Sequence, residues 1–277
     1  MSNPTITFIG AGNMTAALIG GLIADGVDAQ SIIASDPDAQ RLQALGEGAG
    51  IRTLGNNTEA VAQADVVVLA VKPQVLETVA RELAAPIQEH RPLVVSIAAG
   101  VRSDTLQRWL GDNVALVRSM PNTPAMLQAG ATALFATANV SAGQRDQAES
   151  VLRAVGLTLW VQDESQMDAV TALSGSGPAY FFLMIEAMEG AGAQLGLPPE
   201  TARLLTLQTA LGAARMAIES SDDPATLRKQ VTSPGGTTES AISQLEADGL
   251  RDIFARALTA ARDRSVELSQ QLDKPQV

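Results

Sequence analysis

The stretch TITFIGAGNMTAALIGGLIADG, residues 5–26, decides the fold of this chain. Residues 5–10 form a short apolar run that leads into a glycine-rich turn, which predicts a buried strand. A helix is expected from Met14 to about Ala24, where Asp25 and Gly26 end it. Residues 31–35 predict a second strand, so the stretch opens a βαβ unit of about 30 residues.

The same alternation continues through the first half of the chain. Strands are expected at 65–71, 93–98, 114–118, 131–136 and 157–161, and helices at 74–87 and 142–155. Continuous Val, Ile and Leu runs are typical of parallel strands that are buried on both faces. This half therefore predicts a doubly wound sheet.

The pattern changes after residue 163, where no further strand is expected. Helices are predicted at 178–195, 200–220, 226–230, 238–248 and 250–271. We predict an α/β Rossmann-type doubly wound sheet (residues 1–163) followed by an all-α dimerisation domain (residues 164–277). The helix around 179–193 is apolar almost all round, and so small a helical domain has limited room to bury it. A homodimer through the helical domain follows.

Composition excludes several classes of function. The 277 residues carry a net charge of −11, which disfavours nucleic acid and anionic membrane surfaces as partners. No apolar run of about 18 residues and no signal peptide occurs, so a cytoplasmic protein without membrane contact is expected. With no cysteine and the single histidine His90, no metal site and no thiolate nucleophile are expected.

The turn after the first strand indicates a nucleotide site. Gly10-x-Gly12 between a strand and a helix fits the dinucleotide fingerprint, although Thr15 replaces the third glycine. The first glycine allows the tight turn, and the second lets a pyrophosphate approach the helix N-terminus. Asp36 ends the second strand and is expected to accept hydrogen bonds from both ribose hydroxyls, which favours NAD. Arg41 is the nearest cation for a 2′-phosphate.

Three further loops follow predicted strands, at residues 70–73, 98–100 and 120–124. Because a doubly wound sheet binds ligands at its carboxyl edge, these loops together outline one crevice. The small residues at 98–100 would let a nicotinamide ring lie close to the backbone. Each loop alone is also compatible with a plain βα turn.

A second glycine-rich turn, residues 231–240 (VTSPGGTTES), opens a helix in the second half. Gly235 and Gly236 leave their amides accessible, and free N–H groups at a helix start favour an anion. The hydroxyls of Ser233, Thr237 and Thr238 add donors. An ordinary capped helix start is the alternative.

Six motifs in order resemble the Δ1-pyrroline-5-carboxylate reductase family over essentially the whole chain. They are FIGAGNM (8–14), VKP (71–73), VVSIAAG (94–100), MPNTPA (120–125), SGSGPAY (174–180) and the segment 227–246 around SPGGTT. The resemblance implies reduction of (S)-1-pyrroline-5-carboxylate to L-proline by NADPH or NADH. It also implies dimers that assemble further into a decamer of five dimers.

The predicted site has three parts. The cofactor-binding residues implied by the resemblance are Ile9, Gly10, Ala11, Gly12, Asn13, Met14, Asp36, Asn57, Ala70, Val71, Lys72, Pro73, Ala98, Ala99 and Gly100, and the loop at 120–124 adds Asn122. The substrate-binding residues implied by the resemblance lie in the second turn: Val231, Ser233, Gly235, Gly236, Thr237 and Thr238. Thr238 is the first candidate proton donor and Tyr180 the second, with a packed aromatic as the alternative for Tyr180. Some relatives carry a small hydroxyl residue where this chain has Asp36, so NADH stays open beside NADPH.

Three other functions are alternatives to pyrroline-5-carboxylate reduction. A β-hydroxyacid dehydrogenase shares the two-domain plan but relies on a lysine in the interdomain cleft, and no lysine lies between Lys72 and Lys229. A reductase of another cyclic imino acid stays open, because one methylene discriminates weakly. A non-catalytic NAD(P)-binding sensor also stays open, although it would not require the turn at 231–238.

Overall fold

The computed structural model describes residues 4–273, which form two compact units. The first unit runs to Ser176 and takes up the chain again at Ala261, and the second is Gly177–Ala260. This division lies after the boundary predicted at residue 163, because two short helical segments stay with the first unit. These are α7 (Gln166–Val170), which packs on the sheet, and the π-helix η3 (Thr171–Gly175).

The first unit is built on a sheet that, within residues 4–273, has eight strands in the order β3-β2-β1-β4-β5-β6-β7-β8. All neighbouring pairs are parallel except β6 and β7, which are antiparallel. The predicted doubly wound sheet is therefore confirmed, and β3 is a strand that the sequence did not predict. The strands are Ile6–Ile9 (β1), Ile32–Ser35 (β2), Arg52–Leu54 (β3), Val66–Leu69 (β4), Leu93–Ser96 (β5), Leu116–Met120 (β6), Gly130–Ala136 (β7) and Gly156–Trp160 (β8).

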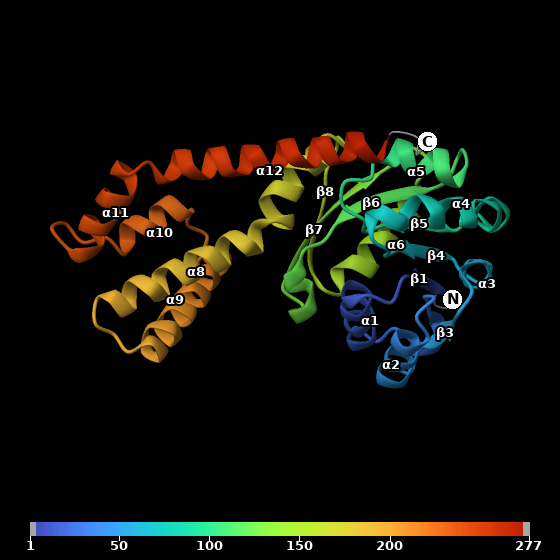
Figure 1. Cartoon of the computed structure of the whole chain (residues 1–277), viewed down its shortest axis with the longest axis horizontal. Coiled ribbons are helices and arrows are strands. Elements are labelled where there is room, and N and C mark those ends of the chain that lie inside the picture. The colour runs from blue at the N-terminus through green and yellow to red at the C-terminus, as the bar shows by residue number, and fades with distance from the viewer. Residues whose placement is uncertain (1–3, 274–277) are drawn as a thin grey trace. The chain divides into compact units, whose positions relative to one another are not determined.

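Helices of the first unit lie on both faces of this sheet (Figure 1). The predicted helices at 74–87 and 142–155 are confirmed, whereas α2, α3 and α5 were not predicted. The helices besides α7 and η3 are Asn13–Ala24 (α1), Ala39–Ala49 (α2), Asn57–Val61 (α3), Pro73–His90 (α4), Ser103–Leu110 (α5) and Ala142–Arg153 (α6), with short 3₁₀ turns at Ala29–Ser31 (η1) and Thr123–Leu127 (η2).

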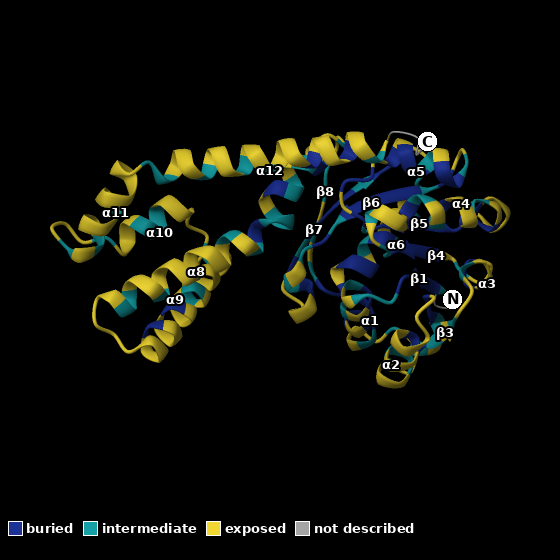
Figure 2. Cartoon of the chain, viewed as in Figure 1, coloured by how far each residue is buried: buried dark blue, intermediate teal, exposed yellow. Residues whose placement is uncertain are grey.

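The central strands are buried on both faces, as their uninterrupted apolar sequences predict (Figure 2). One apolar cluster includes Phe8, Leu18 and Val68, and the other includes Leu69 and Leu83. The buried sheet fixes the carboxyl ends of β1, β2 and β4 at one edge, where the connecting loops gather.

The second unit is helical throughout its described length, as predicted. Its helices are Gly177–Gln194 (α8), Pro199–Glu219 (α9), Pro224–Gln230 (α10), Thr237–Ala247 (α11) and the first part of α12 (Leu250–Leu272), which ends in the first unit. α8 and α9 lie side by side (Figure 1). Within residues 4–273, no helix is long and apolar enough to cross a membrane.

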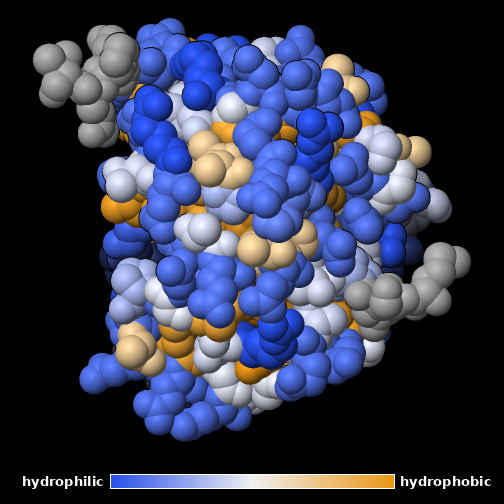
Figure 3. Space-filling model, turned by 90° about the vertical axis from the view of Figure 1, so that its right-hand side faces the viewer, coloured by the Kyte–Doolittle hydropathy of each residue, from blue (hydrophilic) through white to orange (hydrophobic). Residues whose placement is uncertain are grey.

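The two units differ in how much apolar surface they expose. On α8 and α9, Phe181, Phe182, Leu183 and Leu204 are each more than 60% exposed, and Ile218 is 83% exposed. On the face shown in Figure 3 hydrophilic residues predominate, with hydrophobic residues in small groups between them. The first unit also exposes single apolar side chains, such as Leu127 and Leu157. Large apolar side chains this exposed are typical of an association surface, so the helical unit is expected to associate.

Candidate functional site

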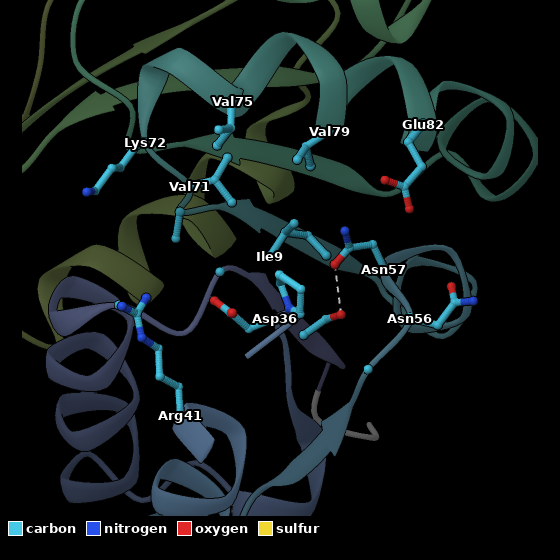
Figure 4. Close-up of a pocket in the computed structure, with 16 residues that line it drawn as sticks. Ile9, Asp36, Arg41, Asn56, Asn57, Val71, Lys72, Val75, Val79 and Glu82 are labelled. Carbon is cyan, nitrogen blue, oxygen red and sulfur yellow. Dashed lines mark hydrogen bonds between the residues drawn. The ribbon is translucent and has the colours of Figure 1, made fainter. Parts of the chain in front are cut away.

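A cavity of about 620 Å³ opens in the first unit where β1, β2 and β4 end (Figure 4). It is large enough for a ligand of nucleotide size. Eight of the predicted cofactor residues line it: Ile9, Gly10, Gly12, Asp36, Asn57, Ala70, Val71 and Lys72. The structure thus brings together segments that lie far apart in the sequence.

The glycines of the first turn have distinct physical roles. Gly10 has φ of +105°, which L-residues with a side chain rarely adopt. A Cβ atom there would also lie only 2.7 Å from the carbonyl oxygen of Ala70, so both the backbone conformation and the lack of space exclude a side chain. A Cβ at Gly12 would meet nothing within 4 Å, which leaves open space above its backbone. Gly12 also precedes α1, whose first turn receives no side-chain cap. These features form a cradle that accepts an anion at a helix N-terminus.

Asp36 is buried, at 9% exposure, and two backbone amides hold its carboxylate in place. Ala11 N–H donates to Oδ2 at 2.8 Å, and Asp38 N–H donates to Oδ1 at 2.9 Å. A carboxylate has about four lone-pair sites, so acceptor capacity remains for a ligand. In Figure 4 the Arg41 guanidinium extends from α2 on the side of this carboxylate, and its Nε lies 3.2 Å from Asp38 Oδ2.

The opposite walls of the cavity contain residues that the sequence did not single out. Val75 and Val79 project from α4 into the cavity (Figure 4), although Val75 is 49% exposed. Asn56, which was also not singled out, caps α3 by accepting the Glu59 N–H. Beside it, the predicted residue Asn57 accepts the Ser35 hydroxyl on Oδ1 at 2.8 Å. The four-residue spacing of the two valines was a usable signal, because it puts both on one face of a helix.

A second cavity of about 470 Å³ in the first unit takes in three more predicted residues, Pro73, Ala99 and Gly100. Gly100 has φ of +76°, which requires glycine. Thr171 and the end of α12, including Leu268, complete its lining. Ala98 is buried beneath the same loop.

Asn122, another predicted cofactor residue, has both ends of its side-chain amide engaged by the protein. Its Nδ2 donates to the carbonyl oxygen of Ser174 at 3.0 Å, and its Oδ1 accepts the Ala131 N–H at 2.9 Å. These bonds tie the end of β6 to η3 and β7. The remaining predicted cofactor residues, Asn13 and Met14, form the first turn of α1, with Met14 packed against the core.

The predicted substrate turn lies in the second unit, between α10 and α11. Gly235 has φ of +69°, and Gly236 is the N-cap of α11 without a side-chain cap. The Gly235 N–H donates to Glu239 Oε2 at 2.6 Å, and the Gly236 N–H donates to the Ser233 carbonyl oxygen at 3.0 Å. A carboxylate already sits on one of these amides, so the turn is chemically suited to that group.

The other residues predicted around the turn are exposed or half-buried. Val231 is 59% exposed, and Ser233 and Thr237 are exposed as well. Thr238 is half-buried, as is Tyr180 on α8. The structure therefore builds the nucleotide crevice in one unit, and the turn with both candidate proton donors in the other.

Side-chain hydrogen bonds at the surface lower the pKa values of Glu246 and Asp273. The hydrogen bond from Arg251 lowers the pKa of Glu246 in the second unit. In the first unit, hydrogen bonds from the Thr105 hydroxyl and from Arg108 lower the pKa of Asp273, which ends the described chain. Within residues 4–273, no group of three or more His, Cys, Asp or Glu side chains is placed to hold a metal ion.

Two family models match the chain. Residues 164–268 match the model described as pyrroline-5-carboxylate reductase dimerisation, and residues 5–100 match the model described as NADP oxidoreductase, coenzyme F420-dependent. A curated pyrroline-5-carboxylate reductase of Pseudomonas aeruginosa is 57% identical over 98% of this chain and 99% of its own length. One of Synechocystis is 43% identical over 95% and 97% of the two chains.

Solved structures agree with these matches. A pyrroline-5-carboxylate reductase from Coxiella burnetii superposes with a TM-score of 0.94 at 49% identity, covering 97% of this chain and 99% of that one. The pyrroline carboxylate reductase of Plasmodium falciparum, solved with NADP bound, superposes with a TM-score of 0.85 at 27% identity, with the same coverage.

Proposed function

The chain belongs to the pyrroline-5-carboxylate reductase family, and from this premise we propose how its residues reduce 1-pyrroline-5-carboxylate to proline. It is an NAD(P)-dependent oxidoreductase that acts on a C=N bond, with NADPH as the first proposed cofactor and NADH as the second. The observation that carries the proposed site is the cavity at the ends of β1, β2 and β4, with its uncapped helix start.

The cradle around Gly10 and Gly12 fits the pyrophosphate of the cofactor. The open space above Gly12 allows close approach to the backbone, and the N-terminus of α1 favours the negative charge. Ile9, Ala70 and Val71 give apolar contacts beside it, and Lys72 adds a positive charge at the rim.

Asp36 is proposed to accept hydrogen bonds from the ribose hydroxyls of the adenosine half. The amides of Ala11 and Asp38 leave the carboxylate no freedom to turn away, so its remaining lone pairs are preorganised. Arg41 is the cation that would face a 2′-phosphate, and Asn57 lies on the far side of the same cavity. Val75 and Val79 offer the adenine ring an apolar wall.

The loop at 98–100 is proposed to lie against the nicotinamide ring, which supplies the hydride when the cofactor is bound. Gly100 brings backbone close to the ligand without a side chain in between. The role of Asn122 is proposed to be indirect, because its amide is used to hold Ser174 and Ala131.

The turn at 231–238 is proposed to bind the substrate carboxylate. Its proposed donors are the Gly235 amide and the hydroxyls of Ser233, Thr237 and Thr238, with Val231 beside them. Gly236 contributes open backbone, because its own N–H already donates to the Ser233 carbonyl oxygen. Glu239, whose carboxylate accepts the Gly235 N–H, must give up this amide or share the turn with the substrate.

Little acid–base chemistry is required of the protein. A cyclic imine is basic enough to bind protonated, and orienting two reactants can supply up to about 7–11 kcal/mol of the acceleration. Where a proton donor is needed, Thr238 is the first candidate because it sits in the turn, and Tyr180 is the second.

Replacing Thr238 tests this assignment. In Thr238→Ala, kcat/KM for the imine is expected to fall roughly 10²-fold, while the Kd for NADPH stays at the wild-type value. Ser240→Ala, which removes a hydroxyl two residues away on the same helix, is the matched control and should behave as wild type. An unchanged kcat/KM in Thr238→Ala would remove this residue from the site, as the sensor hypothesis expects.

A reductase of another cyclic imino acid is the second candidate, since the turn recognises a carboxylate and not the ring size. Comparing kcat/KM for the five-membered and six-membered imino acids decides between the two substrates.

The helical unit supports homo-oligomerisation, because residues 164–268 match a dimerisation family and α8 and α9 expose large apolar side chains. A homodimer through this unit is the proposed building block. A decamer of five dimers and a cytoplasmic location remain predictions.

A further inference from the structure

Glu164 lies outside every residue set assigned above, yet its carboxylate sits at the centre of a buried polar cluster. Oε1 accepts the Ser103 N–H at 2.7 Å, and Oε2 accepts the Ser103 hydroxyl at 2.5 Å. The Arg118 guanidinium donates to Oε1 at 2.9 Å. The side chains of Arg118 and Glu164 are only 4% and 13% exposed, so the pair is shielded from solvent.

This cluster fixes one end of the loop proposed to meet the nicotinamide. Ser103 is the first residue of α5, and the loop 97–102 immediately precedes it. In α5 the residue before the first turn, Arg102, supplies no side-chain cap. Instead, the carboxylate of Glu164, 61 residues further along the chain, accepts the N–H of the first helical residue.

The other end of the same loop is held as well. Ser96, the last residue of β5, accepts the Ala98 N–H on its hydroxyl at 3.3 Å, and its carbonyl oxygen accepts the Ser119 hydroxyl at 2.9 Å. Arg118 lies directly opposite Ser96 in the register of β5 and β6. β6 therefore supports both ends of the loop, through Ser119 at the start and through Arg118 and Glu164 at the finish.

The loop is also held between these ends. Ala98 and Val101 are buried in the apolar core and Gly100 adopts φ of +76°, so Ala99 is the exposed residue of the segment 98–101. This packing and the hydrogen bonds at the two ends together set where the backbone lies. A displacement of about 1 Å at a reacting centre is enough to lower a rate by roughly 10²-fold.

We propose that Glu164 is a positioning residue, which holds the loop 97–102 in the place where the nicotinamide ring binds. This rests on the proposed function of the loop. If Glu164 were needed only for folding, its loss would weaken the binding of all ligands alike. The loss of a positioning residue weakens the binding of the nicotinamide half alone.

The test compares two ligands in Glu164→Gln, where an NH2 group that cannot accept a hydrogen bond replaces one carboxylate oxygen and the negative charge opposite Arg118 is lost. NADPH reaches the loop, whereas 2′,5′-ADP reaches only the Asp36 end of the crevice. The Kd for NADPH is expected to rise about tenfold and kcat for the imine to fall roughly 10²-fold, with the Kd for 2′,5′-ADP unchanged. Glu149→Gln, which alters the carboxylate paired with Arg153 and Trp160, is the matched control and should leave all three values at wild type.

Each outcome has a definite meaning. If Glu164→Gln lowers the affinities for NADPH and 2′,5′-ADP equally, or lowers neither, the proposal is overturned. If Glu164→Gln does not fold, Ser103→Ala, which removes only the hydroxyl donor to Oε2, is measured by the same comparison, and equal affinities for wild type and variant overturn the proposal. A wild-type protein that binds NADPH no more tightly than 2′,5′-ADP would instead contradict the proposed function of the loop.

Discussion

At the scale of single residues, Asp36 is proposed to determine which cofactor the crevice favours. Its carboxylate is held by the amides of Ala11 and Asp38, and it would repel a 2′-phosphate at close range. In Asp36→Ser, the ratio of kcat/KM for NADPH to that for NADH is expected to rise about tenfold or more. Asp146→Ser, an exposed acid on α6, is the control for net charge. A ratio that does not move would show that Asp36 does not read the ribose.

The residues of the crevice were only partly predictable from the sequence. Gly10, Gly12 and Asp36 belong to a local strand–turn–helix pattern, so their roles follow from spacing alone. Asn122 was assigned to the cofactor because its loop follows a strand, but its partners Ser174 and Ala131 come from elements whose positions only the fold determines. Glu164 was missed for the same reason, since no spacing connects it with Ser103.

At the scale of elements, α1 offers a test of how closely it packs. A Cβ added at Gly21 would lie 2.4 Å from the Ala154 carbonyl oxygen, whereas a Cβ at Gly20 would meet nothing within 4 Å. Gly21→Ala is expected to lower the free energy of unfolding by about 1–3 kcal/mol, because neither backbone can move freely. Gly20→Ala should raise it by about 0.5–1 kcal/mol, because alanine favours the helix.

Urea unfolding of the two variants at one protein concentration checks this pair. Stabilisation by both substitutions would contradict the packing of α1 against the segment that follows α6. The sequence cannot distinguish the two neighbouring glycines, because the contact of Gly21 is made across 133 residues by the fold.

The contact between the end of α12 and α5 gives a prediction about pH. Since the bonds from Thr105 and Arg108 lower the pKa of Asp273 in the folded state, their stabilisation is present above about pH 4. It is lost as the pH falls through the lowered value. The side chain is 42% exposed, so the contribution is no more than about 1 kcal/mol.

Asp273→Asn should therefore lower stability at neutral pH and show less further loss below pH 4 than the wild type. Urea unfolding between pH 3 and pH 7 measures both effects. Parallel pH profiles for the two proteins would show that this carboxyl does not couple folding to protons.

The elements themselves were predicted with uneven success for physical reasons. Continuous apolar runs identified β1, β4 and β5, since these strands are buried on both faces. β3 is short and only half-buried, and its residues carry no such pattern. Helix α5 was missed because it has only eight residues, too few for its period to stand out.

At the scale of the whole molecule, the exposed apolar face of α8 and α9 predicts assembly. Leu211 on α9 is 55% exposed, and Leu211→Glu would place a charge in an interface that excludes water. Sedimentation at micromolar concentration is expected to show this variant at a lower mass than the wild type, with a subunit of 28.7 kDa. Asn139→Asp, an exposed polar position in the first unit, is the control for added charge. An unchanged mass in Leu211→Glu would place the association surface elsewhere.

The chain reduces the C=N bond of 1-pyrroline-5-carboxylate with hydride from a nicotinamide cofactor. The most direct measurement supplies NADPH deuterated at the transferring C4 position and analyses the product by mass spectrometry and NMR. The expected result is proline with one deuterium at C5 and one cofactor oxidised per imine consumed. Tight cofactor binding without oxidation, or oxidation that leaves no deuterium in proline, would contradict the claim.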